Sequence, residues 1–359
     1  MKKLITLSIV FLLYNNLAKS QGCIVIRNIS GYGQYNFATN AFTSSDWQLN
    51  VTSRYFKAYK DYKLTHNQNT LASNESVVKS FSTDFTISRF LKNGWSLDFS
   101  VPISSNSRTA DLEHGGPNTT RHTTSTFGLG DIRFTVYKWL FNTSIRQKGN
   151  LQVGLGIKFP TGDYRYQDYF YRNDSTRVLA PVNLSIQLGD GGTGIITALN
   201  GFYFFNKSIS AYGNFYYLIN PRDQSGVSTL FGRTATNLQI ITWSTVSSVP
   251  DVYSWRIGGS FNYKNLAFSA GLREDGIPVN DLIGESNGVR RPGYNFSVEP
   301  GLTYNLPKAS LYLYVPFIVS REIKQANPDA KITEITGTYT AGAGGSGDCQ
   351  VILGVQFML

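Results

Sequence analysis

Apolar and polar residues alternate one by one along most of the chain beyond residue 45. In Leu151–Phe159 every odd position is apolar and every even position is polar or glycine. Trp95–Val101 and Trp255–Tyr263 repeat this pattern, and the final segment places Val351, Leu353, Val355, Phe357 and Leu359 on one face. A period of two is typical of a β-strand whose two faces meet different surroundings.

The alternation predicts about twelve strands, an even number, each close to or longer than the roughly 9–11 residues of a tilted membrane-spanning strand. Three prolines fall inside these segments, although proline cannot donate a hydrogen bond to a neighbouring strand. We expect Pro102 and Pro316 to lie at bulges near the outer ends of their strands, whereas the position of Pro300 in mid-strand has no explanation from the sequence. The expected strands are 46–62, 77–91, 95–104, 128–140, 150–160, 192–205, 209–220, 251–263, 265–274, 292–305, 310–321 and 348–359.

The connections between these segments alternate between short and long. The short ones hold Lys92–Gly94, Asn142–Gly149, Asn206–Lys207, Lys264–Asn265 and Pro307–Lys308. The long ones cover about 63–76, 105–127, 161–191, 221–250, 275–291 and 322–347. This regular sorting predicts an all-β fold, a transmembrane antiparallel up-and-down β-barrel with short periplasmic turns and long extracellular loops.

Composition supports a barrel in a membrane. Charged residues make up only 16% of the chain and aromatic residues 14%. The mean hydropathy is −0.18, which excludes a helical membrane protein. The formal net charge of +10 is scattered along the chain, and together with the export signal described next it argues against nucleic acid as a partner.

The first twenty residues have the features of a signal peptide. Lys2 and Lys3 precede the apolar run Leu4–Leu13, and Ala18–Ser20 fits a cleavage site between small residues. We therefore expect a signal peptide over 1–20, a periplasmic or lumen-plugging segment over 21–45 and the barrel over 46–359, in the outer membrane. Cys23 and Cys349 could form a disulfide, whereas acylation of Cys23 is the alternative.

Extrapolation of the alternation directs several charged side chains into the lumen, because a charge that faces lipid near the midplane costs about 2–4 kcal/mol. They could form a lining that selects permeants by charge, or a salt-bridged interior that fills the barrel. Tyr212, Tyr216, Tyr312 and Tyr314 also point inward in this reading, either along a path for aromatic solutes or as packing. The charged lumen candidates are Arg54, Asp84, Asp98, Arg133, Lys158, Arg256, Arg273 and Glu299.

The short turns carry cations and no acidic residue. They could contact anionic phospholipid headgroups, or they could simply be soluble turn residues. The three histidines, His66, His114 and His122, fall in expected extracellular loops without the spacing of a zinc site, so we predict no metal and no cofactor. No Ser–His or Cys–His arrangement is evident, and we predict a protein that is not an enzyme. The cations of the short turns are Lys92, Arg146, Lys148, Lys207, Lys264 and Lys308.

Gly-rich turns carry a resemblance to a known family. Gly128, Gly130 and Asp131 open one strand, Pro160, Thr161, Gly162 and Asp163 follow the next, and Gly189–Gly194 precedes a third. This order resembles a family of outer-membrane barrels labelled as phenol-degradation meta-pathway proteins and described as transporter-like, and the cleavage site resembles those of Bacteroidota. The resemblance implies a barrel that passes small aromatic or other hydrophobic compounds. From the residues alone, glycine permits tight turning, and Asp131 and Asp163 can accept hydrogen bonds from backbone N–H groups.

The leading hypothesis is passive transport or binding of small hydrophobic or aromatic solutes. The alternative is a closed structural or surface-interaction barrel that acts through its extracellular loops. In either case we expect outer-membrane lipids and lipopolysaccharide as surroundings.

Overall fold

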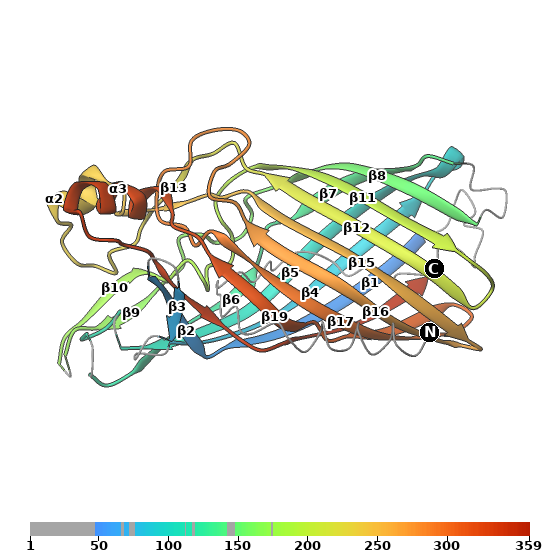
Figure 1. The fold of residues 1–359 in the computed structure, drawn as a ribbon, viewed down its shortest axis with the longest axis horizontal. Coiled ribbons are helices and arrows are strands. Elements are labelled where there is room, and N and C mark those ends of the chain that lie inside the picture. The colour runs from blue at the N-terminus through green and yellow to red at the C-terminus, as the bar shows by residue number, and fades with distance from the viewer. Residues whose placement is uncertain are drawn as a thin grey trace, which may run out of the picture.

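The computed structural model describes residues 47–359 except 66–67, 72–75, 112, 117–118, 142–147 and 174. The expected signal peptide, the 21–45 segment and Cys23 lie outside the described residues. Most of the described chain forms one closed, strongly tilted antiparallel sheet (Figure 1).

Twelve strands close the barrel, as the alternation predicts. Each pairs antiparallel with the next along the chain, and pairing of the first strand with the last, from Gln48↔Met358 to Phe56↔Gln350, completes the ring. Two of the twelve are interrupted and carry two labels each, β6 with β7 and β18 with β19. The barrel strands are β1 (Trp47–Ala58), β4 (Val77–Phe90), β5 (Trp95–Ala110), β6 (His122–Leu129), β7 (Arg133–Trp139), β8 (Gly149–Lys158), β11 (Gly194–Phe204), β12 (Ile209–Ile219), β15 (Val252–Tyr263), β16 (Leu266–Ile277), β17 (Gly293–Asn305), β18 (Ala309–Tyr314), β19 (Phe317–Ile323) and β21 (Gln350–Met358).

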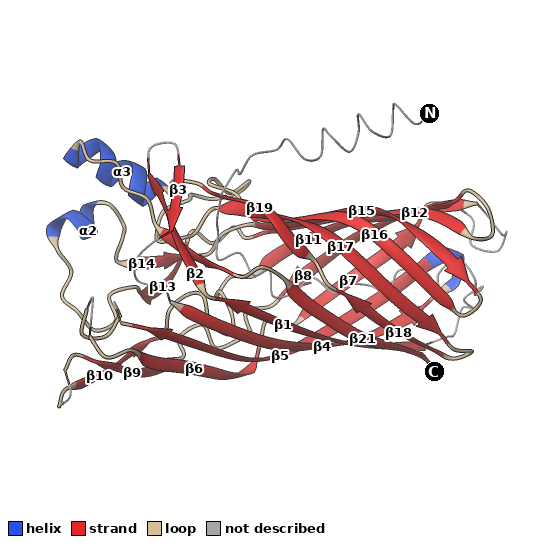
Figure 2. Cartoon of the chain, turned by 60° about the horizontal axis from the view of Figure 1, so that its bottom comes forward, coloured by secondary structure: helices blue, strands red, loops and turns tan. Residues whose placement is uncertain are grey.

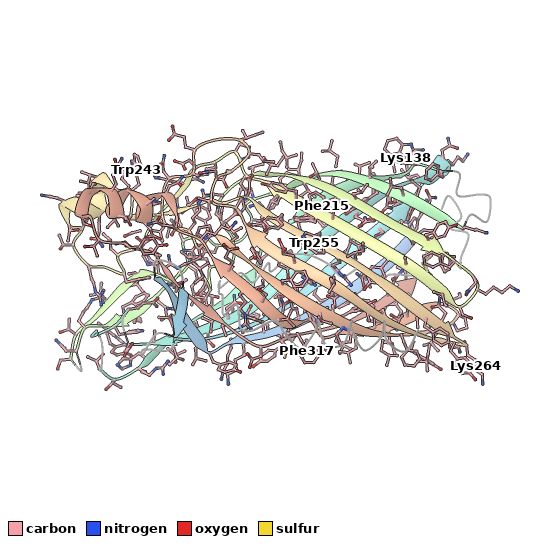
Figure 3. All side chains as sticks on the ribbon, in the orientation of Figure 1. Lys138, Phe215, Trp243, Trp255, Lys264 and Phe317 are labelled. Atoms are coloured by element: carbon pink, nitrogen blue, oxygen red, sulfur yellow. The ribbon has the colours of Figure 1, made fainter. Side chains whose placement is uncertain are left out.

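The outer wall of the barrel is apolar and its interior is polar. On β8, Leu155 is 62% exposed and Ile157 44%, whereas Gln152 and Lys158 on the other face are buried. Phe215, Trp255 and Phe317 lie along the wall between the two ends of the molecule (Figure 3). An apolar band around a closed sheet is the surface that a bilayer covers. The barrel is therefore an outer-membrane barrel, and the alternation follows from lipid outside and a polar lumen inside.

Inward-facing tyrosines pack over glycines on the neighbouring strand. Tyr137 pairs with Gly154, Tyr212 with Gly258, Tyr314 with Gly301 and Tyr312 with Gly354. A Cβ built at any of these glycines would come within about 2.6 Å of the tyrosine opposite. Each ring thus occupies the space that a missing side chain leaves, which accounts for part of the glycine content and for the inward tyrosines.

Each of the three strand prolines lies in an interruption of a barrel strand or opposite one. Gly130 N–H donates to the Pro102 carbonyl at 2.8 Å, in the gap between β6 and β7. Val315 N–H donates to the Pro300 carbonyl at 3.1 Å, next to Pro316, which separates β18 from β19. The sheet therefore loses few hydrogen bonds at these prolines, and the position of Pro300 is explained by the break opposite it.

The connections are short at the periplasmic end and long at the extracellular end, as predicted. The turn between β4 and β5 is a single 3-10 turn, η2 (Lys92–Gly94). The other end extends far beyond the apolar band and carries small sheets and two helices (Figures 1 and 2). No helix among the described residues is long and apolar enough to cross a membrane. The extracellular elements are β2 (Lys60–Thr65), β3 (Gln68–Leu71), β9 (Gln167–Tyr171), β10 (Arg177–Pro181), β13 (Gln224–Ser228), α2 (Asn237–Ile241), β14 (Val246–Ser248), α3 (Asn327–Thr336) and β20 (Ala343–Ser346).

The expected loop over 105–127 was partly wrong. β5 continues to Ala110, and β6 starts at His122 and pairs with it along its length. These residues are mostly serine and threonine on both faces. Outside the bilayer neither face has to be apolar, so the alternation that marks the other strands is absent here.

Candidate functional site

The interior of the barrel holds buried charges that form ion pairs across strands. Arg133 contacts Asp84 at 3.1 Å, from β7 to β4. Glu299 contacts Arg256 at 2.6 Å and Arg273 at 3.2 Å, and Arg273 also contacts Asp275 at 2.8 Å. Buried carboxylates and guanidinium groups thus neutralise one another, as groups cut off from water must. All eight lumen candidates are 5% exposed or less: Arg54, Asp84, Asp98, Arg133, Lys158, Arg256, Arg273 and Glu299.

A second charged cluster joins the Gly-rich turns. Lys158 lies 3.5 Å from Asp131 and is also paired with Asp190. The Asp131 carboxylate accepts hydrogen bonds from the N–H groups of Gly162 (3.0 Å) and Asp190 (3.3 Å). The Asp163 carboxylate accepts one from Arg165 N–H at 3.0 Å. The turns around 130, 162 and 190 therefore lie against one another.

The other motif residues complete this junction. The Thr161 hydroxyl donates to the Gly130 carbonyl at 2.8 Å and accepts from Ile132 N–H at 2.9 Å. Gly128 has a φ of 155°, a value that favours glycine, and its Cα faces Leu188. Pro160 lies two residues beyond the end of β8. These contacts fix the external segment that leads to residue 190 onto the barrel wall.

That external segment enters the mouth of the barrel. Val182 and Ile186 are buried against Phe56, Ala58 and Val78 of the wall. The Ile186 carbonyl accepts hydrogen bonds from Thr126 at 2.7 Å and from Asn106 at 3.4 Å. This insertion was not predicted, because 161–191 was expected to be an extracellular loop and the segment expected to plug the lumen or lie in the periplasm was 21–45.

A cavity of about 190 Å³ lies beneath this segment. Its walls are largely apolar and include Phe56, Leu188, Leu218 and Val252. The lining also holds Tyr216 and the ion-paired group of Lys158 with Asp131 and Asp190. The arrangement offers an apolar ring-sized space with hydrogen-bonding groups at its edge.

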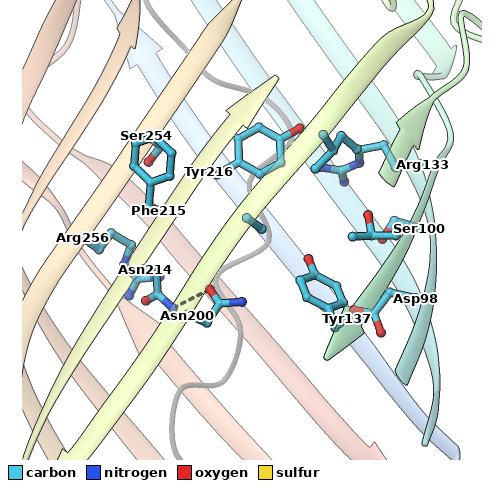
Figure 4. Close-up of a pocket in the computed structure, with 13 residues that line it drawn as sticks. Asp98, Ser100, Arg133, Tyr137, Asn200, Asn214, Phe215, Tyr216, Ser254 and Arg256 are labelled. Atoms are coloured by element: carbon cyan, nitrogen blue, oxygen red, sulfur yellow. Dashed lines mark hydrogen bonds between the residues drawn. The ribbon is translucent and has the colours of Figure 1, made fainter. Parts of the chain in front are cut away.

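A second, smaller cavity of about 50 Å³ is lined by polar side chains of the ion-paired layer. Asp98, Arg133 and Arg256 line it, and Asn200 accepts a hydrogen bond from Asn214 at 2.9 Å there (Figure 4). Tyr216 lines both cavities, and its hydroxyl points toward Arg133 and is hydrogen-bonded to it (Figure 4). Tyr216 therefore stands between the apolar and the polar space.

Two of the histidines form an aromatic cluster outside the membrane. His114 is 1% exposed and its Nδ1 accepts a hydrogen bond from Tyr171 N–H at 3.0 Å. Burial, followed by electrostatic repulsion from His122 and Arg172, lowers the pKa of His114 to about 4. The His122 ring stacks on Tyr171 with centroids 4.0 Å apart. His66 lies outside the described residues, and among those described no group of acidic, histidine and cysteine side chains could hold a metal ion.

Cys349 is half-buried just before β21, opposite Phe317. It forms no disulfide with a described residue. The predicted pairing with Cys23 concerns a residue outside the described part of the chain.

No protein-family model matches the sequence, and no protein of curated function is similar enough to count as a relative. Among solved structures, an outer-membrane channel from Pseudomonas putida F1 is similar over 89% of this chain and 97% of that chain, with 12% identity and a TM-score of 0.56. The P. putida toluene transporter TodX (10% identity, 95% of this chain and 98% of that chain, TM-score 0.44) and the Ralstonia pickettii toluene transporter TbuX (11%, 94% and 98%, 0.40) are more distant. The protein thus has the fold of an outer-membrane channel.

Proposed function

We propose that this barrel binds small hydrophobic, ring-sized solutes beneath its extracellular loops and passes them across the outer membrane. The observation that carries the proposal is the apolar cavity of about 190 Å³ under the inserted segment. An apolar cavity of about 150 Å³ in another protein is large enough for benzene. The resemblance of the Gly-rich turns to transporter-like barrels of phenol degradation supports the same substrate class.

The polar part of the lumen supports selectivity against ions. We call the cavity of about 190 Å³ beneath the extracellular loops the outer cavity. A solute that leaves it meets Tyr216 and then the ion-paired layer around Arg133 and Arg256. Paired charges of both signs leave little net field for a free ion, whereas a neutral solute crosses without losing a strong hydration shell. In this mechanism the paired charges and the Tyr216 ring together keep the lumen closed to ions, and Tyr216 controls passage between the two cavities.

A closed barrel that acts through its extracellular loops is the second candidate. The extensive ion pairing and the segment that fills the mouth favour it. The two functions differ in one respect that can be measured, namely occupation of the outer cavity by a solute.

The test uses fluorobenzene as the probe, with the full protein in lipid nanodiscs and ¹⁹F NMR as the readout. Val252 faces the outer cavity, and Val252→Phe fills part of it; Val319→Phe adds the same ring on the lipid-facing wall, where Val319 is 57% exposed. We expect saturable binding in the wild type and in Val319→Phe, and at least tenfold weaker binding in Val252→Phe. Binding that is equal in both variants, or no greater than in empty nanodiscs, would refute the proposal.

A further inference from the structure

The periplasmic end of the barrel carries a ring of exposed cations. They lie in five short turns between consecutive barrel strands and at the strand ends beside these turns. Lys138 and Lys264 are seen at this end in Figure 3. Arg146, the remaining cation of the expected short turns, lies outside the described residues. The exposed turn cations are Lys92, Lys148, Lys207, Lys264 and Lys308.

Aromatic side chains hold several cations of this end at the edge of the apolar band. The Arg89 guanidinium lies 4.7 Å from the centre of the Trp47 ring, Lys138 Nζ lies 5.1 Å from that of Trp95, and Lys264 Nζ lies 5.4 Å from that of Tyr263. The three rings face outward and are 42–56% exposed. Tryptophan and tyrosine prefer the headgroup level of a bilayer, so these pairs place positive charge at the depth of the phosphate groups.

Among the described residues, no aspartate or glutamate accompanies the cations at this end. The described turns and the first two residues of the strands that flank them contain no aspartate or glutamate. The extracellular end is different, because Asp163, Glu285 and Glu334 lie there among the arginines and lysines. The asymmetry is not explained by solubility of turns alone, since turns at both ends face water.

We propose that the periplasmic rim is a binding surface for anionic glycerophospholipid, of the phosphatidylglycerol type, in the inner leaflet. The charge of this lipid is opposite to that of the rim. Its phosphodiester lies at the headgroup level, which is the level at which the aromatic rings hold the lysine and arginine side chains. Each cation near such a surface favours an anionic lipid about fivefold over a neutral one at low salt. The proposal is independent of the solute and of the state of the lumen.

The test measures quenching of tryptophan fluorescence by brominated lipids. The full protein carries Trp243→Phe and Trp255→Phe, so that emission comes from Trp47, Trp95 and Trp139 at the periplasmic end. It is reconstituted in vesicles of phosphatidylcholine that contain increasing fractions of brominated phosphatidylglycerol or of brominated phosphatidylcholine. The rim variant changes Lys92, Lys207, Lys264 and Lys308 to Gln; the matched control changes Arg165, Arg177, Lys324 and Lys331, at the extracellular end, to Gln.

We expect about fivefold stronger association of phosphatidylglycerol with the wild type and the control, falling toward equality in the rim variant and in 0.5 M salt. If the rim variant does not fold, Lys264→Gln alone and the salt titration of the wild type take its place, and each should reduce the preference. Equal quenching by both lipids in the wild type would overturn the proposal. So would a preference that only the control variant loses, because the anionic lipid would then contact the extracellular loops.

Discussion

Glu299 is the acidic centre of the largest buried ion-pair cluster, and Glu299→Gln should strongly destabilise the barrel. Its two carboxylate oxygens lie 2.6 Å from Arg256 and 3.2 Å from Arg273, and all three side chains are 4% exposed or less. Each pair at about 3 Å attracts with about 5 kcal/mol at an effective dielectric constant of 20, against several kcal/mol of desolvation for each ion. Loss of one partner from a buried pair costs about 3–5 kcal/mol, and glutamine keeps an acceptor, so we expect about 3 kcal/mol.

The assay is urea unfolding of the protein in phosphatidylcholine vesicles, followed by tryptophan fluorescence. With a slope of about 3 kcal/mol per molar urea, the midpoint of Glu299→Gln should fall by about 1 M. Glu334→Gln, on the exposed face of α3, should change the free energy of unfolding by less than about 0.5 kcal/mol. Addition of Arg256→Met to Glu299→Gln removes the surplus cation and should recover most of the loss. Equal midpoints for Glu299→Gln and Glu334→Gln would mean that water solvates the cluster, and the reasoning would fail.

Three further predictions concern the lumen, the wall and the loops. Tyr216→Ala joins the two cavities and should raise single-channel conductance in a planar bilayer at least severalfold over the wild type, whereas unchanged conductance would show that Tyr216 is not the barrier. Gly354→Ala places a Cβ 2.2 Å from the Tyr312 ring and should cost about 1–3 kcal/mol in urea unfolding, a loss that Tyr312→Phe should not relieve because the ring remains. Because burial lowers the pKa of His114 to about 4 from 6.5, its contribution to loop stability is complete above pH 6.5 and is lost as pH falls toward 4. The protection factor of Tyr171 N–H, which is its hydrogen-exchange rate relative to the intrinsic rate at the same pH, should fall over that range, and His114→Gln should abolish this pH dependence.

The barrel could be predicted from the sequence because its two environments differ so sharply. Lipid outside and a polar lumen inside force side chains to alternate, so twelve strands and their facing follow from residues such as Leu155 and Lys158. Beyond the bilayer the two faces of a strand no longer meet different surroundings, and the strands there could not be predicted. The β5–β6 extension beyond the membrane has serine and threonine on both faces, and no pattern marked it.

The partners of the lumen charges could not be predicted. The alternation specifies whether a side chain faces the lumen or the lipid, but not its position along the barrel axis. Asp84 and Arg133 belong to β4 and β7, with β5 between them, so their contact depends on the stagger of three strands. Asp275 was missed because the expected strand ended at 274, whereas β16 continues to Ile277. The insertion of 182–190 depends on its contacts with Asn106 and Thr126, which are distant in sequence.

Tyr312 connects the last strands to the first. Its ring lies over Gly354 of β21, and its hydroxyl is hydrogen-bonded to Asn50 (2.9 Å) and Thr52 (2.5 Å) of β1. Until β1 pairs with β21, this hydroxyl lacks both partners, and a one-residue slip of β1 would turn Asn50 and Thr52 toward lipid. The contact can therefore form only in the correct register. During folding it stabilises the closed barrel with β1 correctly paired, and it does not stabilise a barrel in which β1 is misaligned.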